Sequence, residues 1–510
     1  MSNYLSKNGY VIRKESITKE ELSLLKNELI ARPLSDSKYG NLQDQNFPVY
    51  IETKTKIYIP KMYGISKYGY PDTVLENFEG QETRVIEFKG TLYPNQIEPV
   101  KILVENCHEK GGGILQLSTG AGKTVGALKA ISELKGKSLI IVNKISLLNQ
   151  WKKEIEKFLP DASIGIIQGQ KNVDVHDKDI VLAMLQSLSR IDYPQELFKD
   201  FRVVLVDECH NTSSKCFSKV LFKLCAKYTI GLSATPKRSD GCEYVFKWHI
   251  GDIVFESSEK RKGLPPIIRL LKIDSKEYKE VSREDHSGQK QLVFASMISE
   301  LINMEKRNLL IVEIIKNLIK ENRKILVLSH RREHILTLKS LLDSDKLVSF
   351  TYGVFLGAMK IKDLDKARTC QTILATNAAF SEGVSEESLD TLILCTPNKF
   401  IGHLKNSVKK DTGKLNQSVG RIFRRSHIER NPVIVDLQDN FSVYKSQSNG
   451  RNVFYKQHFE NKIIEHLHIN LDDHENVSIS FIKTKKKTEE LNKNEEIERN
   501  ILSHCCIIDE

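Results

Sequence analysis

The chain has 510 residues, of which 40% are hydrophobic and 28% are charged, and its formal net charge is +11 at pH 7. This composition is that of an ordinary globular protein, and the length suggests about three domains. The positive charge favours a polyanionic partner. Nine cysteines without a C-x-x-C pair argue against a disulfide or zinc framework and for a reducing, intracellular compartment. No run of about 18 apolar residues occurs, so we expect no membrane partner.

Residues 1–88 are mixed and rich in turns, and we expect them to form a small N-terminal module. From residue 89 the chain repeats a pattern of apolar strand, loop and helix. The strand-like runs of the first repeat are GILQL, SLIIV, IVLAML, VVLVDE and YTIGLS. Short, fully apolar runs that alternate with helices predict a parallel sheet covered on both faces. We therefore expect a first α/β domain over residues 89–257.

The alternation stops at SSEKRKGLPP, and residues 258–310 are predicted to be a linker and helical segment. It resumes in a second α/β domain over residues 311–470, with the runs KILVLS, QTILAT, TLILCTP and PVIVDL. Residues 471–510 are highly charged and low in apolar residues, which is typical of a loosely structured tail.

The segment STGAGKT lies between a predicted strand and a predicted helix, as a phosphate-binding loop does. Gly120 and Gly122 allow backbone amides to face phosphate oxygens, Lys123 would neutralise the phosphates, and Thr124 would ligate Mg²⁺. The predicted nucleotide-binding loop comprises Ser118, Thr119, Gly120, Ala121, Gly122, Lys123 and Thr124. A glycine-rich turn without a ligand is the alternative, and Leu117 stands where the usual loop has its first glycine.

Two adjacent carboxylates, Asp207 and Glu208, end the apolar run VVLVDE. Buried charges need a partner, and Mg²⁺ would be that partner for Asp207, while Glu208 would deprotonate the attacking water. Asp207 could instead cap a helix, but that interpretation leaves Glu208 unexplained. We expect this strand to neighbour the strand of the phosphate loop.

Together, STGAGKT, DECH, LSATP and QSVGRIFR resemble the motif set of superfamily 2 helicases and translocases. The resemblance covers roughly residues 50–470. YIPKMYG, LYPNQ, EGVSEESLDTLILCTP and VIVDLQDNFSVYKSQ look most similar to the XPB/UvsW type. Within that type they are closest to helicases of nucleocytoplasmic large DNA viruses, the group with the poxvirus transcript-release helicase. The resemblance implies two tandem RecA-like domains, ATP and Mg²⁺ as cofactors, and movement on DNA with 3′-to-5′ polarity.

The resemblance also implies roles for single residues. Gln96 of LYPNQ stands where the family reads adenine, and Ser385 stands where the fifth motif usually has Asp. Residues implied to couple hydrolysis to movement are Ser233, Ala234, Thr235, Glu382 and Gly383. Implied catalytic residues of the second domain are Gln417, Arg421 and Arg424. At i, i+3 spacing the two arginines would share one helix face and reach the γ-phosphate across a domain cleft, whereas alone they would be a solvated basic face.

Two further features concern metal and nucleic acid. HRREH, from His330 to His334, fits a zinc-peptidase pattern, but it starts at the end of a predicted strand and matches the fourth helicase motif better. The segment between Lys399 and Arg430 is strongly basic. Its lysines predicted to contact nucleic acid are Lys405, Lys409, Lys410 and Lys414. A solvated loop is the alternative.

The sequence thus predicts an ATP hydrolase that moves on, or unwinds, single- or double-stranded DNA. Transcription or repair proteins would be its partners, and the host cytoplasm or the virion its location if it is viral. Two alternatives remain: an ATP-gated binding factor with little unwinding, and an RNA helicase, because no residue identifies a reader of 2′-hydroxyl groups.

Overall fold

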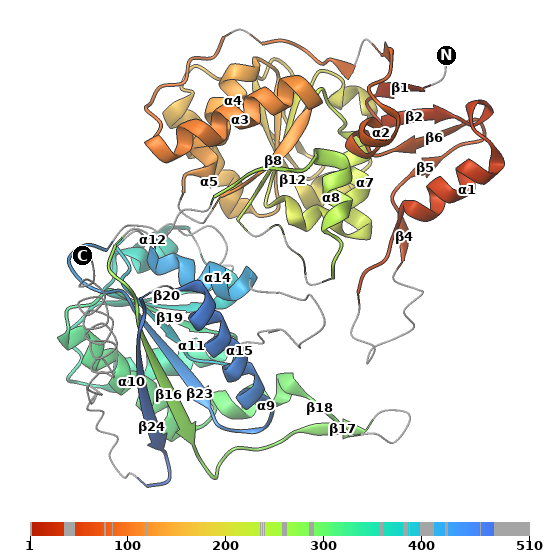
Figure 1. The fold of residues 1–510 in the computed structure, drawn as a ribbon. Coiled ribbons are helices and arrows are strands. Elements are labelled where there is room, and N and C mark those ends of the chain that lie inside the picture. The colour runs from red at the N-terminus through yellow and green to blue at the C-terminus, as the bar shows by residue number, and fades with distance from the viewer. Residues whose placement is uncertain are drawn as a thin grey trace, which may run out of the picture.

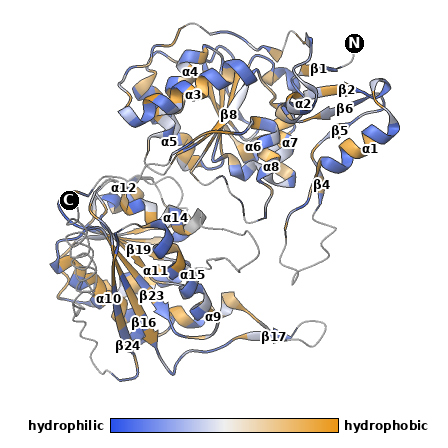
Figure 2. Ribbon diagram, in the orientation of Figure 1, coloured by the Kyte–Doolittle hydropathy of each residue, from blue (hydrophilic) through white to orange (hydrophobic). Residues whose placement is uncertain are grey.

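The structure is a computed structural model that shows two α/β bodies and a small sheet at the N-terminal end (Figure 1). The residues it describes are 3–34, 46–75, 78–83, 85–117, 121–234, 236, 238, 240–257, 263–284, 290–357, 359, 361–380, 386, 388–397, 413–423, 427–459 and 461–473. Hydrophobic residues concentrate along the central strands of both α/β bodies (Figure 2). Among the described residues, no helix has the length and apolar character needed to cross a bilayer.

The first α/β domain contains an eight-stranded sheet with the order β11-β10-β12-β9-β13-β14-β8-β15. Its strands are β8 (Gly112–Gln116), β9 (Ser138–Val142), β10 (Ile164–Gln168), β11 (Asn172–Val173), β12 (Ile180–Met184), β13 (Val203–Asp207), β14 (Tyr228–Ser233) and β15 (Ile253–Glu256). All neighbours pair in parallel except β10 and β11. The five predicted strands and the parallel sheet are therefore confirmed.

Helices cover both faces of this sheet, as predicted, because apolar side chains on each face need cover from water. On one face lie α3 (Pro94–Lys110), α4 (Lys123–Leu134) and α5 (Ile145–Phe158), which contribute Leu103, Leu128 and Trp151 to one core. On the other lie α6 (Leu185–Arg190), α7 (Lys215–Lys223) and α8 (Glu243–Ile250), which contribute Leu188, Val220 and Phe246 to a second core.

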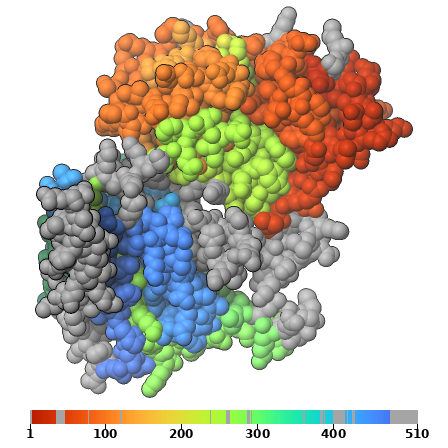
Figure 3. Space-filling view, in the orientation of Figure 1, coloured from red at the N-terminus to blue at the C-terminus, as the bar shows by residue number. Residues whose placement is uncertain are grey.

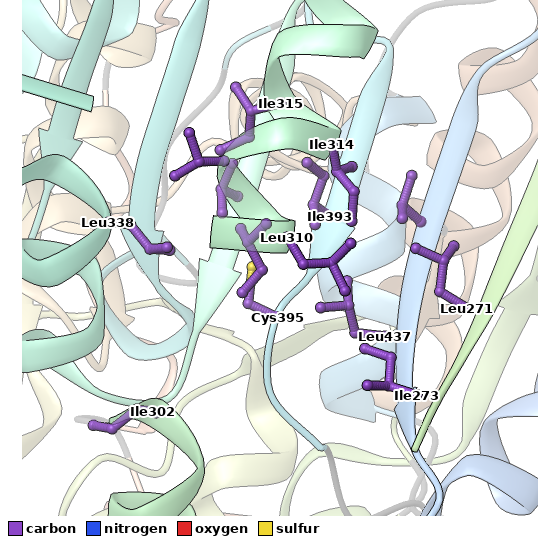
Figure 4. Close-up of a cluster of buried hydrophobic side chains, with 14 of the residues drawn as sticks. Leu271, Ile273, Ile302, Leu310, Ile314, Ile315, Leu338, Ile393, Cys395 and Leu437 are labelled. Atoms are coloured by element: carbon purple, nitrogen blue, oxygen red, sulfur yellow. The ribbon is translucent and has the colours of Figure 1, made fainter. Parts of the chain in front are cut away.

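The second α/β domain has a fully parallel sheet of seven strands in the order β20-β21-β19-β22-β23-β16-β24. Its strands are β16 (Ile267–Asp274), β19 (Ile325–Ser329), β20 (Tyr352–Phe355), β21 (Thr372–Thr376), β22 (Thr391–Leu394), β23 (Val433–Asp439) and β24 (Ile463–Asn470). Its helices are α9 (Phe294–Ile302), α10 (Glu305–Lys320), α11 (Arg332–Ser344), α12 (Ile361–Thr369), α13 (Asn377–Phe380), α14 (Gly413–Val419) and α15 (Ser442–His458). Figure 4 shows Leu310 and Ile314 of α10 packed with Ile393 and Leu437 of the sheet.

This domain begins earlier than predicted. The sequence predicts a linker and helical segment over residues 258–310, but β16 within that range pairs with both β23 and β24. A short hairpin, β17 (Ser282–Glu284) with β18 (Lys290–Leu292), and α9 follow it. Side chains of β16 and α9 are fully part of the second domain's core. The segment is therefore mostly an integral part of the second domain, and the other predicted boundaries stay predictions.

The N-terminal module is a five-stranded sheet with the order β5-β6-β2-β1-β7, accompanied by α1 (Lys19–Glu28) and α2 (Lys61–Tyr68). Its strands are β1 (Asn3–Ser6), β2 (Gly9–Arg13), β5 (Ile51–Glu52), β6 (Lys56–Ile59) and β7 (Thr73–Val74), and a separate pair is formed by β3 (Ile30–Ala31) and β4 (Phe47–Pro48). Figure 3 shows its surface continuous with that of the first α/β domain.

Two buried lysines of the N-terminal module form hydrogen bonds to the first α/β domain. The Lys7 ammonium donates to the Phe201 carbonyl at 2.6 Å, and the Lys61 ammonium donates to the carbonyls of Gly111 and Ala226 at 2.8 and 2.9 Å. Burial lowers the pKa of Lys7 to about 8 and also lowers that of Lys61. Since both ammonium groups donate to carbonyls of the first domain, the module is an integrated part of that domain.

Candidate active site

Three predicted motifs meet at the carboxyl ends of β8, β14 and β13, which lie next to one another in that order. The register pairs Gln116 with Ser233 and Leu232 with Asp207, so the chain leaves all three strands at the same edge. Such an edge is where open parallel sheets bind ligands. The expectation that the phosphate loop and the DECH residues follow neighbouring strands is wrong, because β14 lies between β8 and β13.

The structure describes the second half of the phosphate loop, from Ala121 to Thr124. Ser118, Thr119 and Gly120 lie outside the described residues. Gly122 has φ +76° and precedes α4, whose first residue is Lys123. A Cβ at Gly122 would lie 1.9 Å from Nε2 of Gln96 and would have to displace that side chain, and the positive φ also favours glycine. The Lys123 ammonium donates to the Leu117 carbonyl at 3.1 Å, and half-buried Thr124 follows it. The helix start directs free backbone amides toward the loop, where an anion is stabilised.

Gln96 of α3 contacts the phosphate loop directly. Its Nε2 donates to the Ala121 carbonyl at 3.2 Å, while its Oε1 accepts from the Tyr93 amide at 2.9 Å. The side chain is only 4% exposed. Gln96 therefore ties the start of α3 to the loop, and its role in reading adenine stays a prediction.

Asp207 is held by two donors at the end of β13. Its Oδ2 accepts from the Trp151 indole at 2.8 Å and its Oδ1 accepts from the Glu208 amide at 2.9 Å. Burial, followed by the negative charge of Glu208, raises the pKa of Asp207 to about 6, although the indole and Lys123 oppose that rise. A divalent cation would relieve the cost of this buried charge. Trp151 was not among the predicted site residues.

Glu208 adopts an unusual backbone conformation, with φ +48°. Positive φ is costly for a residue with a side chain and is concentrated at functional sites. Its Oε2 is buried and has no hydrogen-bond partner within the described part of the chain. The nearest basic atom is Nδ1 of His210 at 3.4 Å. The carboxylate is therefore placed to accept a proton or a water hydrogen at this edge of the sheet.

The residues present fit Mg²⁺. Mg²⁺ prefers hard oxygen ligands, and proteins usually hold it with one or two carboxylates together with substrate phosphates. Asp207 and Thr124 supply a carboxylate and a hydroxyl at the same edge. No group of three or more His, Cys, Asp or Glu that could hold a metal by protein ligands alone occurs among the described residues.

The third motif is connected to the second by side chains. Ser233 Oγ lies 3.0 Å from Nδ1 of His210, and Arg238 donates to the His210 carbonyl. Arg238 in turn forms an ion pair with Asp240, with its Nε 2.8 Å from Oδ1. Ala234 directly follows β14, and Thr235 lies outside the described residues. Arg238 was not among the predicted site residues.

The second domain places Arg421 in a short 3-10 helix, η6 (Gly420–Phe423), that follows α14. The preceding helix α14, which contains Gln417, ends at Val419, and the helix face predicted for Arg421 and Arg424 stays a prediction, because Arg424 lies outside the described residues. Arg421 is buried, with its guanidinium carbon 5.8 Å from the centre of the Phe380 ring.

Most of the predicted coupling and nucleic-acid-binding residues of the second domain fall outside the described ranges. Arg424, Glu382, Gly383, Lys405, Lys409 and Lys410 lie outside the described residues, as do the side chains of Gln417 and Lys414. Their predicted roles in catalysis, coupling and nucleic-acid contact stay predictions.

His330 and His334 do not form one metal-binding helix face. His330 precedes α11, whereas His334 is buried within it. The two ring nitrogens of His334 lie 2.9 Å from Ser329 Oγ and 2.9 Å from Asn308 Oδ1. Burial lowers the pKa of His334 to about 3, so the ring is neutral. His334 is therefore a structural histidine with both nitrogens occupied.

Two polar residues at the same edge of the first sheet were missed. Asn143 follows β9, and Gln186 follows β12, the strand beside it. The Gln186 amide nitrogen donates to the Asn143 carbonyl at 2.7 Å, and the side-chain oxygens of both residues are buried without a hydrogen-bond partner in the described ranges. The signal available in the sequence was a polar residue directly after, or one residue beyond, an apolar strand run.

Comparison with known proteins identifies the family. The model of the family described as "Type III restriction enzyme, res subunit" matches residues 89–238. A protein of Acanthamoeba polyphaga mimivirus named "Putative ATP-dependent RNA helicase" is 30% identical over 453 residues, which cover 88% of this chain and 84% of that protein. The chain belongs to the superfamily 2 helicases. The predicted resemblance to helicases of large DNA viruses is thereby confirmed, as is ATP-dependent helicase activity on nucleic acid.

Two further relatives match parts of the chain. A protein of Invertebrate iridescent virus 6, whose name also says helicase, is 26% identical over 396 residues, or 73% of this chain and 82% of that protein. The "DNA 3'-5' translocase XPB2" of Sulfurisphaera tokodaii is 36% identical over 174 residues, or 34% of this chain and 37% of that protein.

Proposed function

We propose that this helicase is a DNA motor that hydrolyses ATP at the carboxyl edge of β8, β14 and β13. The observation that carries the proposal is the buried Glu208 Oε2, which lacks a hydrogen-bond partner among the described residues and stands beside the buried Asp207. An unsatisfied buried carboxylate costs stability unless a ligand completes its hydrogen bonds. An attacking water is such a ligand.

In this proposal Lys123 exchanges its bond to the Leu117 carbonyl for the β- and γ-phosphates, which the backbone amides at the start of α4 also hold. Asp207 and Thr124 would hold Mg²⁺, which when bound neutralises charge on the phosphates. The Trp151 indole keeps Asp207 ionised and oriented. Glu208 orients the water and takes its proton as the bond to the γ-phosphate forms.

Arg421 is proposed to act on the same γ-phosphate from the second domain. A guanidinium supplied across two domains stabilises the charge of the transition state and makes hydrolysis depend on domain closure. The stacking of Arg421 on Phe380 keeps the guanidinium in place within its own domain. Domain closure coupled to hydrolysis would then drive movement.

DNA is proposed as the track, with 3′-to-5′ movement. Support comes from the identity of 36% with a protein named as a DNA 3′-5′ translocase. The buried side-chain oxygens of Asn143 and Gln186 continue the ligand edge beyond Asp207, where N–H groups of nucleic-acid bases would donate to them. RNA is the second candidate, since the mimivirus relative is named as an RNA helicase.

The test is ATP turnover titrated separately with single-stranded DNA, duplex DNA and RNA of the same sequence. The proposal predicts stimulation by DNA at lower concentrations than by RNA. Stimulation by RNA alone would make the protein an RNA motor, and turnover unaffected by all three would refute the coupling to nucleic acid.

A further inference from the structure

The outer face of the N-terminal sheet has a regular arrangement of aromatic and basic side chains. The register pairs Tyr4 with Val11, Val11 with Tyr58, and Tyr58 with Ile51 across β1, β2, β6 and β5. Residues paired directly in neighbouring strands point to the same face of a sheet. Tyr4 and Tyr58 therefore flank Val11 in one row, which runs across the sheet shown beside the first α/β domain (Figure 1).

The opposite face of this sheet is the one that the module buries. Leu5, Tyr10 and Ile59 form the alternate row, and they pack with Leu25 of α1 in one hydrophobic core. None of the hydrophobic clusters in the described part of the chain contains Tyr4, Val11, Tyr58 or Ile51. Ile51 is 42% exposed and both tyrosines are partly exposed, whereas Val11 between them is buried. We call the row Tyr4–Val11–Tyr58–Ile51 the outer row.

Positive charge borders the outer row. Arg13 pairs with Lys56 in the next row on the same face. The Lys56 ammonium of β6 reaches Tyr4 of β1 on the other side of β2, where it donates to the hydroxyl at 2.9 Å and lies 5.5 Å from the ring centre. The Nε of Arg13 is buried and has no hydrogen-bond partner within the described ranges, while its Nη1 lies 3.5 Å from the carboxylate of Glu15. Lys54, in the turn before β6, is exposed.

Aromatic rings on a sheet next to cations suit one kind of ligand. Nucleobases stack on tyrosine rings without regard to sequence, and lysine or arginine neutralises the phosphates between them. Cations alone would also suit an acidic protein, whereas rings and cations side by side match the bases and the phosphates of a nucleic acid. The charge complementarity therefore points to nucleic acid rather than to a protein, and only unpaired bases can reach the rings.

We infer that the outer row is a second nucleic-acid site, which binds single-stranded nucleic acid by stacking bases on Tyr4 and Tyr58. Arg13, Lys54 and Lys56 would contact the backbone of that strand. Lys7 and Lys61 fix the module to the domain that carries the ATP site, so a strand bound here is held at a constant distance from the motor. The outer row is separate from the ATP site at the edge of β8, β14 and β13. Its binding of single-stranded nucleic acid would be a function in addition to the proposed motor.

The test uses the full chain and a fluorescent single-stranded DNA in an anisotropy titration. The double variant Tyr4→Leu/Tyr58→Leu removes both rings and keeps apolar volume. One stacked base contributes enough that its loss should weaken binding at least about fivefold. Tyr4→Phe/Tyr58→Phe should bind as the wild type does, because the rings remain. Tyr68→Leu is the matched control, since Tyr68 is a 39% exposed tyrosine of the same module that stacks on Tyr10, on the other face.

A DNA strand of the same length with abasic sites distinguishes the contribution of base stacking to the affinity from that of the phosphate charges. It should bind the wild type and the double leucine variant equally, since it has no bases to stack. Basal ATP turnover and the melting temperature should stay unchanged in every variant, which shows that the motor is intact. An unchanged affinity of the double leucine variant for normal DNA would overturn the inference and leave the face to a protein partner. An equal loss for normal and abasic strands would overturn it as well.

Discussion

The hydrogen bond from Trp151 to Asp207 offers a quantitative test of the metal site. The indole Nε1 lies 2.8 Å from the carboxylate, and it opposes the effect of burial on the pKa of Asp207. A hydrogen bond to a charged group is worth about 1.5–3 kcal/mol. One pKa unit corresponds to about 1.36 kcal/mol. Trp151→Phe should therefore raise the pKa of Asp207 by about one to two pH units.

The direction in which the pH profile should move follows from the protonation state of Asp207 that binds the metal. Only the ionised carboxylate ligates Mg²⁺, so hydrolysis is lost as the pH falls through the pKa of Asp207. Raising that pKa moves the loss to higher pH. The acid limb of kcat/KM against pH, measured at a fixed and limiting Mg²⁺ concentration, should move upward by about one to two pH units in Trp151→Phe.

Trp248→Phe is the matched control, because the chain has two tryptophans and Trp248 packs against Tyr63 and Tyr244, away from Asp207. Its acid limb should coincide with that of the wild type. Both variants lose core volume, so melting temperatures must accompany the profiles. An unmoved acid limb in a folded Trp151→Phe protein would refute the assignment of Asp207 as the titrating metal ligand.

Two further predictions concern the second domain. Arg421→Ala should slow ATP hydrolysis by ~10³-fold or more while it weakens ATP binding far less, because a finger acts on transition-state charge; equal losses in single-turnover and binding measurements would indicate a structural arginine. Lys409→Ala/Lys410→Ala should reduce the slope of log DNA affinity against log salt by about one to two, since each phosphate contact contributes about 0.7 to 0.9; an unaltered slope would remove these lysines from the interface.

The strands that the sequence predicted share one property, which is an uninterrupted apolar run. β9 (SLIIV) and β12 (IVLAM) are wholly buried. The apolar character of these runs therefore indicates a buried strand directly from the sequence. β16 was missed because Arg269 interrupts IIRLLKID. The structure pairs that arginine with Glu321 and Glu465, which lie far away in the sequence. An arginine whose charge is neutralised by distant residues resembles an arginine of a loop when only its neighbours in the sequence are considered.

The site was predictable in its residues but not in its arrangement. Asp207 and Glu208 stood out because two charges at the end of a buried strand need a partner. The order of strands is set by pairing between distant segments, so the position of β14 between β8 and β13 could not be predicted from either motif. The indole partner of Asp207 comes from α5, 56 residues earlier, and only the fold brings them together. The outer row likewise depends on pairing across four strands.

Glu208→Gln tests the central claim, that Glu208 activates the attacking water, most directly. Nucleotide binding by equilibrium titration and phosphate release in a single turnover should be measured on the same protein, with Lys123→Ala as the comparison that loses binding. The amide introduced by this substitution is nearly the size of the carboxylate but cannot take a proton, so binding should remain near the wild-type level while phosphate release disappears. Phosphate release at close to the wild-type rate from Glu208→Gln would contradict the account.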